Sequence, residues 1–281
     1  MTIITPDARL LSEIAPMMAD IGAQQCGDGC REYHRAWGYL RLFAALPAVG
    51  RDHEVLLTTL RAQIQQDRRR ILISGAADAG ILAYVIEAFR LEGATGKITV
   101  VDTCGTPLSI NSWYGTRSGW PIETWCGPIQ DFDGRGFDVV VSHNFLNSIA
   151  PEDRRAVCTA WRGALDEGGR AVFIAQLKPD KPLYGRRFDD KQVSVLVNDY
   201  LQARAKSDHR ELITSAALEK IVRSFAETRY SHRLQTLEQI AAPLEDSGFR
   251  NLEIADIGTS LPISQAVGST RRVSVVAEKV D

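Results

Sequence analysis

The chain has 281 residues, which suits one large domain or one domain with a cap, and its 33 basic residues nearly balance 35 acidic ones. The longest basic tract is only the three arginines 68–70, so the sequence lacks the basic footprint of a nucleic-acid-binding protein. It also lacks an apolar run long enough to span a membrane and a signal-peptide pattern. We therefore expect a cytoplasmic monomer or homodimer with no nucleic-acid or membrane partner.

The first part of the chain, residues 1–66, is predicted to be a helical cap or lid. Asp7 is placed to cap a helix over 8–20, whose apolar residues have helical spacing. A loop rich in Gly, Cys and Asp follows at 22–29. A second helix is predicted over 31–46, closed by Pro47, and a third begins near residue 52.

From residue 67 onward, strands alternate with helices. The predicted strands lie at 71–74, 98–101, 122–126, 137–142 and 170–177, and the helices between them at 81–91, 109–115 and 152–165. Continuous apolar runs such as 139–141 indicate a parallel sheet covered on both faces. Right-handed crossovers then predict an open, doubly wound α/β sheet.

The alternation of strands and helices stops after Leu177. A polar stretch leads into one long helical region at 191–228, which we interpret as a helical insertion over about 178–230 within a domain of residues 67–281. A helix at 236–247 is followed by two adjacent strands at 251–257 and 271–278. These strands predict a terminal β-hairpin.

The stretch 68–102 indicates a nucleoside ligand. Its small-residue turn, beginning Gly75, Ala76 and Ala77, allows a ligand close to the backbone, and Asp102 ends the next strand, where an acid can accept hydrogen bonds from ribose hydroxyls. The turn lacks the middle glycine of a dinucleotide motif, and Asp78 would repel a pyrophosphate, so NAD and FAD are disfavoured. The alternative is a strand–turn–helix unit that binds nothing.

The five cysteines predict no metal centre. Cys104, Cys126 and Cys158 fall in predicted core segments, where thiols pack as small apolar groups. Cys26 and Cys30 are close in sequence, but no other Cys or His pair supplies the rest of a zinc site. We expect reduced thiols and no metal.

A family resemblance rests on the small-residue turn, Asp102, the segment 136–147 and the terminal hairpin. Over residues 68–281 the chain resembles the class I S-adenosylmethionine-dependent methyltransferases. The resemblance implies a Rossmann-like seven-stranded sheet of order 3-2-1-4-5-7-6 with strand 7 antiparallel, an N-terminal helical lid, and S-adenosylmethionine as cofactor. Ile73 stands where the family's first motif has an acid, and of its three glycines only Gly75 is kept.

The resemblance also implies a set of binding residues. Asp102 would hold the ribose, the segment around Asp131 would contact adenine, and the aromatic rings of the lid helix would attract a sulfonium. The full predicted cofactor-binding set is Gly75, Ala76, Ala77, Asp102, Thr103, Ile129, Gln130, Asp131, Ser142, Asn144, Tyr33 and Trp37. Alternatively, Asp131 caps a turn, and Tyr33 and Trp37 are ordinary core residues.

The predicted activity is methyl transfer from S-adenosylmethionine to a small-molecule acceptor. His143 is the candidate general base, although it is equally compatible with a structural role at the sheet edge, and Asn144 and Tyr184 complete the predicted catalytic set. A second interpretation is cyclisation of S-adenosylmethionine to azetidine-2-carboxylate with release of methylthioadenosine. There Asn144, Asn147 and Tyr184 would hold the amine. A third is a non-catalytic, nucleoside-binding regulator.

Overall fold

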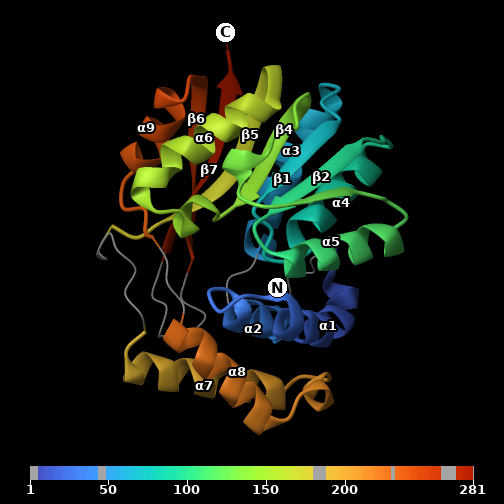
Figure 1. Cartoon of the computed structure of the whole chain (residues 1–281), viewed down its shortest axis with the longest axis vertical. Helices are drawn as coiled ribbons and strands as arrows, with labels where there is room; N and C mark the ends of the chain where they lie inside the picture. The colour runs from blue at the N-terminus through green and yellow to red at the C-terminus, as the bar shows by residue number, and fades with distance from the viewer. Residues whose placement is uncertain (1–5, 44–48, 180–187, 229–231, 261–269, 281) are drawn as a thin grey trace.

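A single mixed sheet forms the centre of the protein (Figure 1). The structure is a computed structural model, and it describes residues 6–43, 49–179, 188–228, 232–260 and 270–280. The strand order is β3-β2-β1-β4-β5-β7-β6. All described pairings are parallel except those of β7, which runs antiparallel to both β5 and β6. The predicted seven-stranded topology is confirmed. The strands are β1 (Arg70–Ser74), β2 (Lys97–Asp102), β3 (Glu123–Cys126), β4 (Phe137–His143), β5 (Leu165–Leu177), β6 (Phe249–Ser260) and β7 (Thr270–Lys279).

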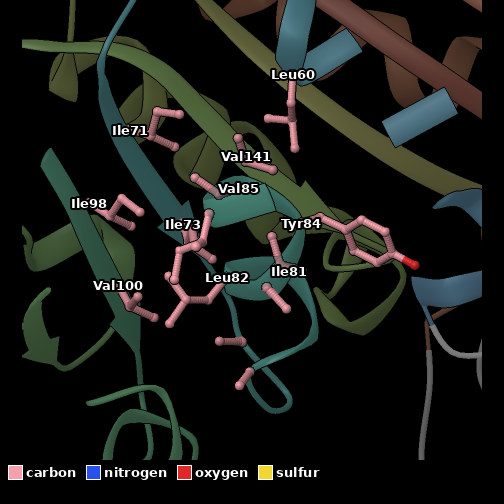
Figure 2. Close-up of a cluster of buried hydrophobic side chains, with 14 of the residues drawn as sticks. Leu60, Ile71, Ile73, Ile81, Leu82, Tyr84, Val85, Ile98, Val100 and Val141 are labelled. Carbon is pink, nitrogen blue, oxygen red and sulfur yellow. The ribbon is translucent and has the colours of Figure 1, made fainter. Parts of the chain in front are cut away.

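Helices cover both faces of the sheet. One face packs against α3 (His53–Gln65), α4 (Gly80–Leu91) and α5 (Gly105–Arg117), and the other against α6 (Arg154–Ala164) and α9 (Glu238–Asp246). Successive residues of a strand point to opposite faces, so Ile71 and Ile73 enter the first core while Leu72 enters the second. Figure 2 shows the first of these cores.

The cap is built from two helical pairs that are distant in sequence. The first pair is α1 (Leu11–Gln25), preceded by the short η1 (Ala8–Leu10), and α2 (Arg31–Leu42). The second pair, α7 (Asp190–Ala205) and α8 (Ser215–Thr228), leaves the sheet between β5 and α9. In Figure 1, α1 and α2 lie between the sheet and the second pair. A separate apolar cluster, which includes Leu40 of α2 and Phe225 of α8, joins the two pairs.

The structure corrects several local predictions. Asp7 makes no side-chain cap, because its carboxylate binds Arg41 instead. The predicted helix over 191–228 is two helices, with η6 (Arg210–Leu212) between them. The strand predicted at 170–177 begins earlier, at Leu165, and β5 contains a bulge where its register with β4 shifts between Phe137 and Val139. Cys126 is exposed on the edge strand β3 rather than buried.

The remaining short helices lie in the connections between the larger elements. They are η2 (Val49–Asp52), η3 (Ile129–Asp131), η4 (Leu146–Ser148) and η5 (Pro151–Asp153). In the part of the chain that the structure describes, none of the helices combines the length and apolar character needed to cross a bilayer.

Candidate functional site

The candidate site lies at the carboxyl edge of β1, β2 and β4. Open α/β sheets bind ligands at this edge, where the strand order reverses. The loop 75–79 after β1, residues 103–104 after β2 and residues 144–147 after β4 meet there, and α2 of the cap reaches the same loop.

Asp102, the last residue of β2, connects two of these loops. One carboxylate oxygen accepts a hydrogen bond from the backbone N–H of Ala76 and the other from that of Cys104, each at 2.9 Å. Burial raises the pKa of Asp102 to about 6, and the backbone N–H groups of Cys104, Ala76 and Thr103 oppose that rise only in part. Each oxygen retains a lone pair that can accept from a hydroxyl.

Gly75 has the backbone geometry of a close-approach position. Its φ is +75°, and its N–H donates to Val101 at 2.9 Å. A Cβ at this position would lie only 2.2 Å from Cδ2 of Phe145, so the Phe145 ring lies directly against the glycine. Sequence reasoning did not identify Phe145, because nothing in its neighbourhood signals a contact across the edge between β1 and β4.

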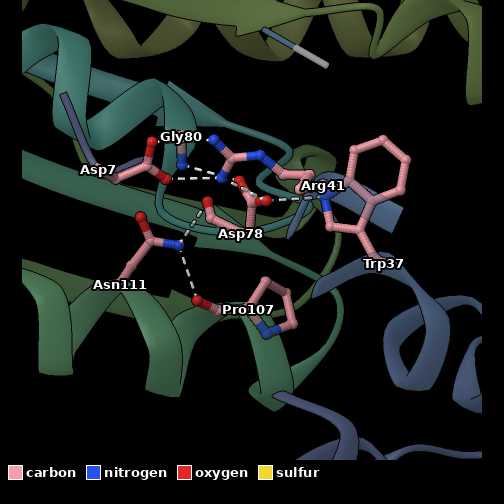
Figure 3. A network of polar contacts seen from close by, with 7 residues as sticks. All are labelled: Asp7, Trp37, Arg41, Asp78, Gly80, Pro107 and Asn111. Atoms are coloured by element: carbon pink, nitrogen blue, oxygen red, sulfur yellow. Dashed lines mark hydrogen bonds and ion pairs between the residues drawn. The ribbon is translucent and has the colours of Figure 1, made fainter. Parts of the chain in front are cut away.

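Asp78 fastens the cap to the loop after β1 (Figure 3). Its carboxylate accepts hydrogen bonds at 2.8 Å from both the Trp37 indole and the Arg41 guanidinium of α2, and at 2.7 Å from the N–H of Gly80. Arg41 also forms a two-pronged ion pair with Asp7 at 2.6 and 2.9 Å. Burial alone would lower the pKa of Arg41, but the two carboxylates raise it overall. Asp78 is thus committed to the cap and is not available to a ligand.

The two aromatic residues predicted to contact the cofactor lie in packing contacts of the cap. The rings of Tyr33 and Trp37 stack with centroids 5.1 Å apart, and Tyr33 also lies 5.9 Å from Phe225 of α8. These contacts agree with the core interpretation of the stripe. Their role against a cofactor stays a prediction.

His143, at the end of β4, belongs to a chain of polar contacts. Its Nε2 lies 2.8 Å from Asp52, whose other carboxylate oxygen accepts from Arg272 of β7. Its Nδ1 lies 3.2 Å from the side-chain nitrogen of Asn144. Both ring nitrogens therefore have partners, and Asp52 fixes the orientation of the ring. Asp52 and Arg272 were not identified from the sequence, since each is a lone charged residue in a distant element.

Two buried polar atoms near the end of β4 have no hydrogen-bond partner among the described residues: Oγ of Ser142 and Oδ1 of Asn144. Asn144 also has a φ of +56°, a left-handed conformation that Asn tolerates better than most residues. Buried polar atoms are almost always hydrogen-bonded in folded proteins. The partnerless oxygen of Asn144 is consistent with a ligand donor at this edge.

The other predicted cofactor-binding residues differ in their exposure. Ile129 is buried in the second core, whereas Gln130, Asp131 and Thr103 are exposed. The loop before η3 does meet the site, because the N–H of Gly127 donates to the backbone oxygen of Asp102 at 2.9 Å. Ala77 is partly buried in the turn after β1. Tyr184 lies outside the described residues.

A cluster of sulfur and nitrogen atoms next to Asp102 was not expected from the sequence. Cys26 and Cys30 of the loop between α1 and α2, His34 of α2, and Cys104 after β2 bring one ligand atom each to within 4.8 Å of one another. The ligands additional to Cys26 and Cys30 do not form a second Cys or His pair in the sequence, because His34 and Cys104 come singly from separate elements.

Comparison with known proteins finds similarity in structure alone. No family model matches the chain, and no curated protein matches it in sequence. The Burkholderia thailandensis 1,6-didemethyltoxoflavin-N1-methyltransferase, solved with its namesake compound and S-adenosylhomocysteine bound, is similar at a TM-score of 0.53 and 16% identity, over 100% of this chain and 93% of that one.

Two further solved structures show the same likeness. The S-adenosylmethionine-dependent methyltransferase SibL gives a TM-score of 0.51 at 16% identity, over 98% of this chain and 70% of that one. An S-adenosylmethionine-dependent methyltransferase from Clostridium acetobutylicum gives a TM-score of 0.51 at 13% identity, over 86% of this chain and 96% of that one. The strand order, the antiparallel β7 and these likenesses together show that the chain has the fold of the S-adenosylmethionine-dependent methyltransferases.

Proposed function

We propose that the protein binds S-adenosylmethionine at the carboxyl edge of its sheet and transfers the methyl group to a small-molecule acceptor. The observation that carries this proposal is Asp102, a partly buried carboxylate at the end of β2 whose partners among the described residues include no cation. A strongly perturbed carboxylate in such a position is typical of a functional site. The shared fold supports the same conclusion.

The residues at this edge fit the proposed cofactor. Asp102 would accept hydrogen bonds from the ribose hydroxyls on its remaining lone pairs. The family's usual acid is absent at Ile73, and Asp78 is engaged by Arg41, so neither holds the methionine amino group. The buried, partnerless Oδ1 of Asn144 is an acceptor suited to that ammonium.

S-Adenosylmethionine supplies an activated methyl group, so the chain's own residues mainly position the acceptor and remove its proton. His143 is the proposed base. Asp52 holds its Nε2–H and would stabilise the imidazolium that forms when Nδ1 takes a proton. For that step the proton-bearing group of the acceptor must take the place of the Asn144 amide nitrogen at Nδ1, which leaves Oδ1 of Asn144 for the ammonium.

The first test is calorimetric titration of the purified protein with S-adenosylmethionine and with S-adenosylhomocysteine. Asp102→Asn should weaken both affinities roughly 10- to 100-fold, because hydrogen bonds to a charged group contribute about 1.5 to 3 kcal/mol each. Asp246→Asn is the matched control, since Asp246 is an exposed acid on the distant α9. Wild-type protein that binds neither compound would contradict the proposal.

The reaction is tested by incubating the protein with S-adenosylmethionine, with and without a panel of small hydroxyl and amine acceptors. Methyl transfer predicts S-adenosylhomocysteine only when an acceptor is present. Methylthioadenosine formed without an acceptor, above a protein-free control, would replace methyl transfer by the cyclisation alternative while retaining the cofactor assignment. His143→Gln should reduce turnover more than it reduces cofactor affinity.

A further inference from the structure

We propose that Cys26, Cys30, His34 and Cys104 form a four-coordinate zinc site that fastens the cap to the cofactor edge of the sheet. This cysteine–histidine cluster brings together three thiol sulfurs and one imidazole nitrogen, all within 4.8 Å of one another. Three thiolates and one imidazole are a ligand set of structural zinc sites in proteins.

Four of the six distances between ligand atoms are close to the edges of a zinc tetrahedron, and the other two are within 4.8 Å. Zn–S bonds of about 2.3 Å and Zn–N bonds of about 2.0–2.1 Å place ligand atoms about 3.8 Å apart for two sulfurs and about 3.5 Å for sulfur and nitrogen. Sγ of Cys104 lies 3.4 Å from Sγ of Cys26 and 3.7 Å from Sγ of Cys30. Nδ1 of His34 lies 3.2 Å from Cys26 Sγ and 3.5 Å from Cys104 Sγ.

The backbone holds the four ligands without needing the metal to draw them together. Cys26 follows the last residue of α1, Cys30 precedes the first residue of α2, and Cys104 precedes the first residue of α5. Cys30 and His34 are four residues apart, and the backbone N–H of His34 donates to the carbonyl of Cys30, so the two lie on one side of the same helical turn. All four side chains are buried or partly buried.

A hydrogen bond outside the ligand set also suits a thiolate. Oγ1 of Thr106, on the first turn of α5, lies 3.0 Å from Sγ of Cys26. Hydroxyl and N–H donors around a metal-bound thiolate orient the ligand and offset its charge. Apolar packing of thiols would explain neither this donor nor the nitrogen of His34 aimed at two sulfurs.

Ligand softness favours zinc over magnesium or calcium, which prefer oxygen ligands. Coordination would convert three thiols into thiolates and release up to three protons to solvent, while His34 binds as a neutral imidazole. No oxidant is needed. All four positions are taken by protein atoms, which is the arrangement of a structural rather than a catalytic zinc site.

The site would connect the cap to the residue proposed to hold the ribose. Three ligands come from the α1–α2 hairpin, whereas Cys104 comes from the sheet domain and donates its backbone N–H to Asp102. Zinc would therefore fix the hairpin over the cofactor edge. This role does not depend on which reaction the protein catalyses.

The test is metal analysis of the full chain, purified with reductant, without chelator and with any affinity tag removed. We expect one zinc per chain. After removal of zinc, titration with cobalt(II) should give the intense ligand-field and sulfur charge-transfer absorption of a tetrahedral thiolate complex. Cys30→Ser and Cys104→Ser should lose stoichiometric zinc and alter that spectrum. Cys126→Ser, which changes an exposed cysteine of β3, should retain both.

A second measurement keeps the proposal testable if the variants fold poorly. Chelation of wild-type protein should speed amide hydrogen exchange in residues 22–34 at least 10-fold and leave β3 unchanged. The proposal is overturned if reduced wild-type protein binds neither zinc nor cobalt(II), if the cobalt spectrum lacks sulfur ligation, or if the purified protein holds iron with acid-labile sulfide instead. A Cys26–Cys104 disulfide that forms in place of metal binding would also overturn it.

Discussion

Asp102 and Asp138 lie on different strands of one sheet and at opposite ends of it, and their carboxylates differ in their burial and in the charge beside them. Both accept hydrogen bonds from two backbone N–H groups, Asp102 from Ala76 and Cys104, and Asp138 from Arg69 and Arg70. Asp138 also accepts hydrogen bonds from the guanidinium of Arg70, whereas Asp102 has no cation among its partners in the described part of the chain.

The pKa values follow from both differences. Burial alone would raise the pKa of Asp138, but the hydrogen bonds from Arg70 and the backbone lower it overall. Burial dominates at Asp102 and raises its pKa to about 6. The amino end of the sheet therefore uses its acid for stability, whereas the carboxyl end keeps a poorly compensated acid at the edge proposed to bind the cofactor.

The largest effect on stability should come from removing the cation that neutralises the most deeply buried carboxylates. Arg41→Met leaves the buried carboxylates of Asp7 and Asp78 without their cation, and we expect a loss of about 3 to 5 kcal/mol in the free energy of unfolding. Urea titration measures it. Arg35→Met is the control on the same helix, because its partly exposed pair with Glu32 should contribute less than about 1 kcal/mol. Equal effects of the two substitutions would contradict this account.

A smaller and pH-dependent effect is expected at the amino end. Asp138→Asn should lower stability by about 1 to 2 kcal/mol at pH 7, since it loses a charge-assisted contact with a half-exposed arginine. The pKa of Asp138 is lower in the folded state than its usual 3.8, so its contribution is present above that value and is lost as the pH falls through the folded pKa. The difference between variant and wild type should therefore shrink in acid.

Urea titrations across that pH range measure the effect. Asp166→Asn serves as the control, because Asp166 binds the same arginine but is half exposed. It should cost less at every pH. A difference between Asp138→Asn and wild type that stays constant down to pH 3 would refute the assignment.

The smallest effect on stability should come from Asp102→Asn. The amide turns an N–H toward one of the two backbone donors and loses that hydrogen bond, but a buried charge is also removed. We expect the free energy of unfolding without ligand to change by less than about 1 kcal/mol at pH 7, which is less than for Asp138→Asn. A larger loss, measured by the same urea titration, would mean that Asp102 is mainly structural.

Most of the fold could be predicted, because its strands are continuous apolar runs separated by turn residues. All seven predicted strands exist, although β5 begins earlier than expected at Leu165. The order of the strands came from the family resemblance rather than from the residues themselves. The break between α7 and α8 was missed because residues 206–214 contain neither Gly nor Pro. Asp7 was misassigned because a cap signal is local, whereas its actual partner, Arg41, is in another helix.

The candidate site was less predictable than the fold. Asp102 and Asn144 could be placed because they closely follow predicted strands, at 98–101 and 137–142. The contact of His143 with Asp52 could not, because their positions are 91 residues apart in sequence. The same holds for Cys104, which meets Cys26 from 78 residues away. Spacing rules detect ligands that come in pairs and miss those supplied one at a time by folding.

The two-part construction of the cap has a consequence for how the chain is made. On the ribosome, α2 emerges early, but α8, which packs against it, appears only after β1 to β5 have been synthesised. At a synthesis rate of about 5 to 20 residues per second, the apolar side of α2 lacks α8 as a packing partner for roughly 10 to 35 seconds. During that interval the nascent sheet and Cys104 are the partners available to the hairpin, so its docking on the sheet comes before its burial under α7 and α8.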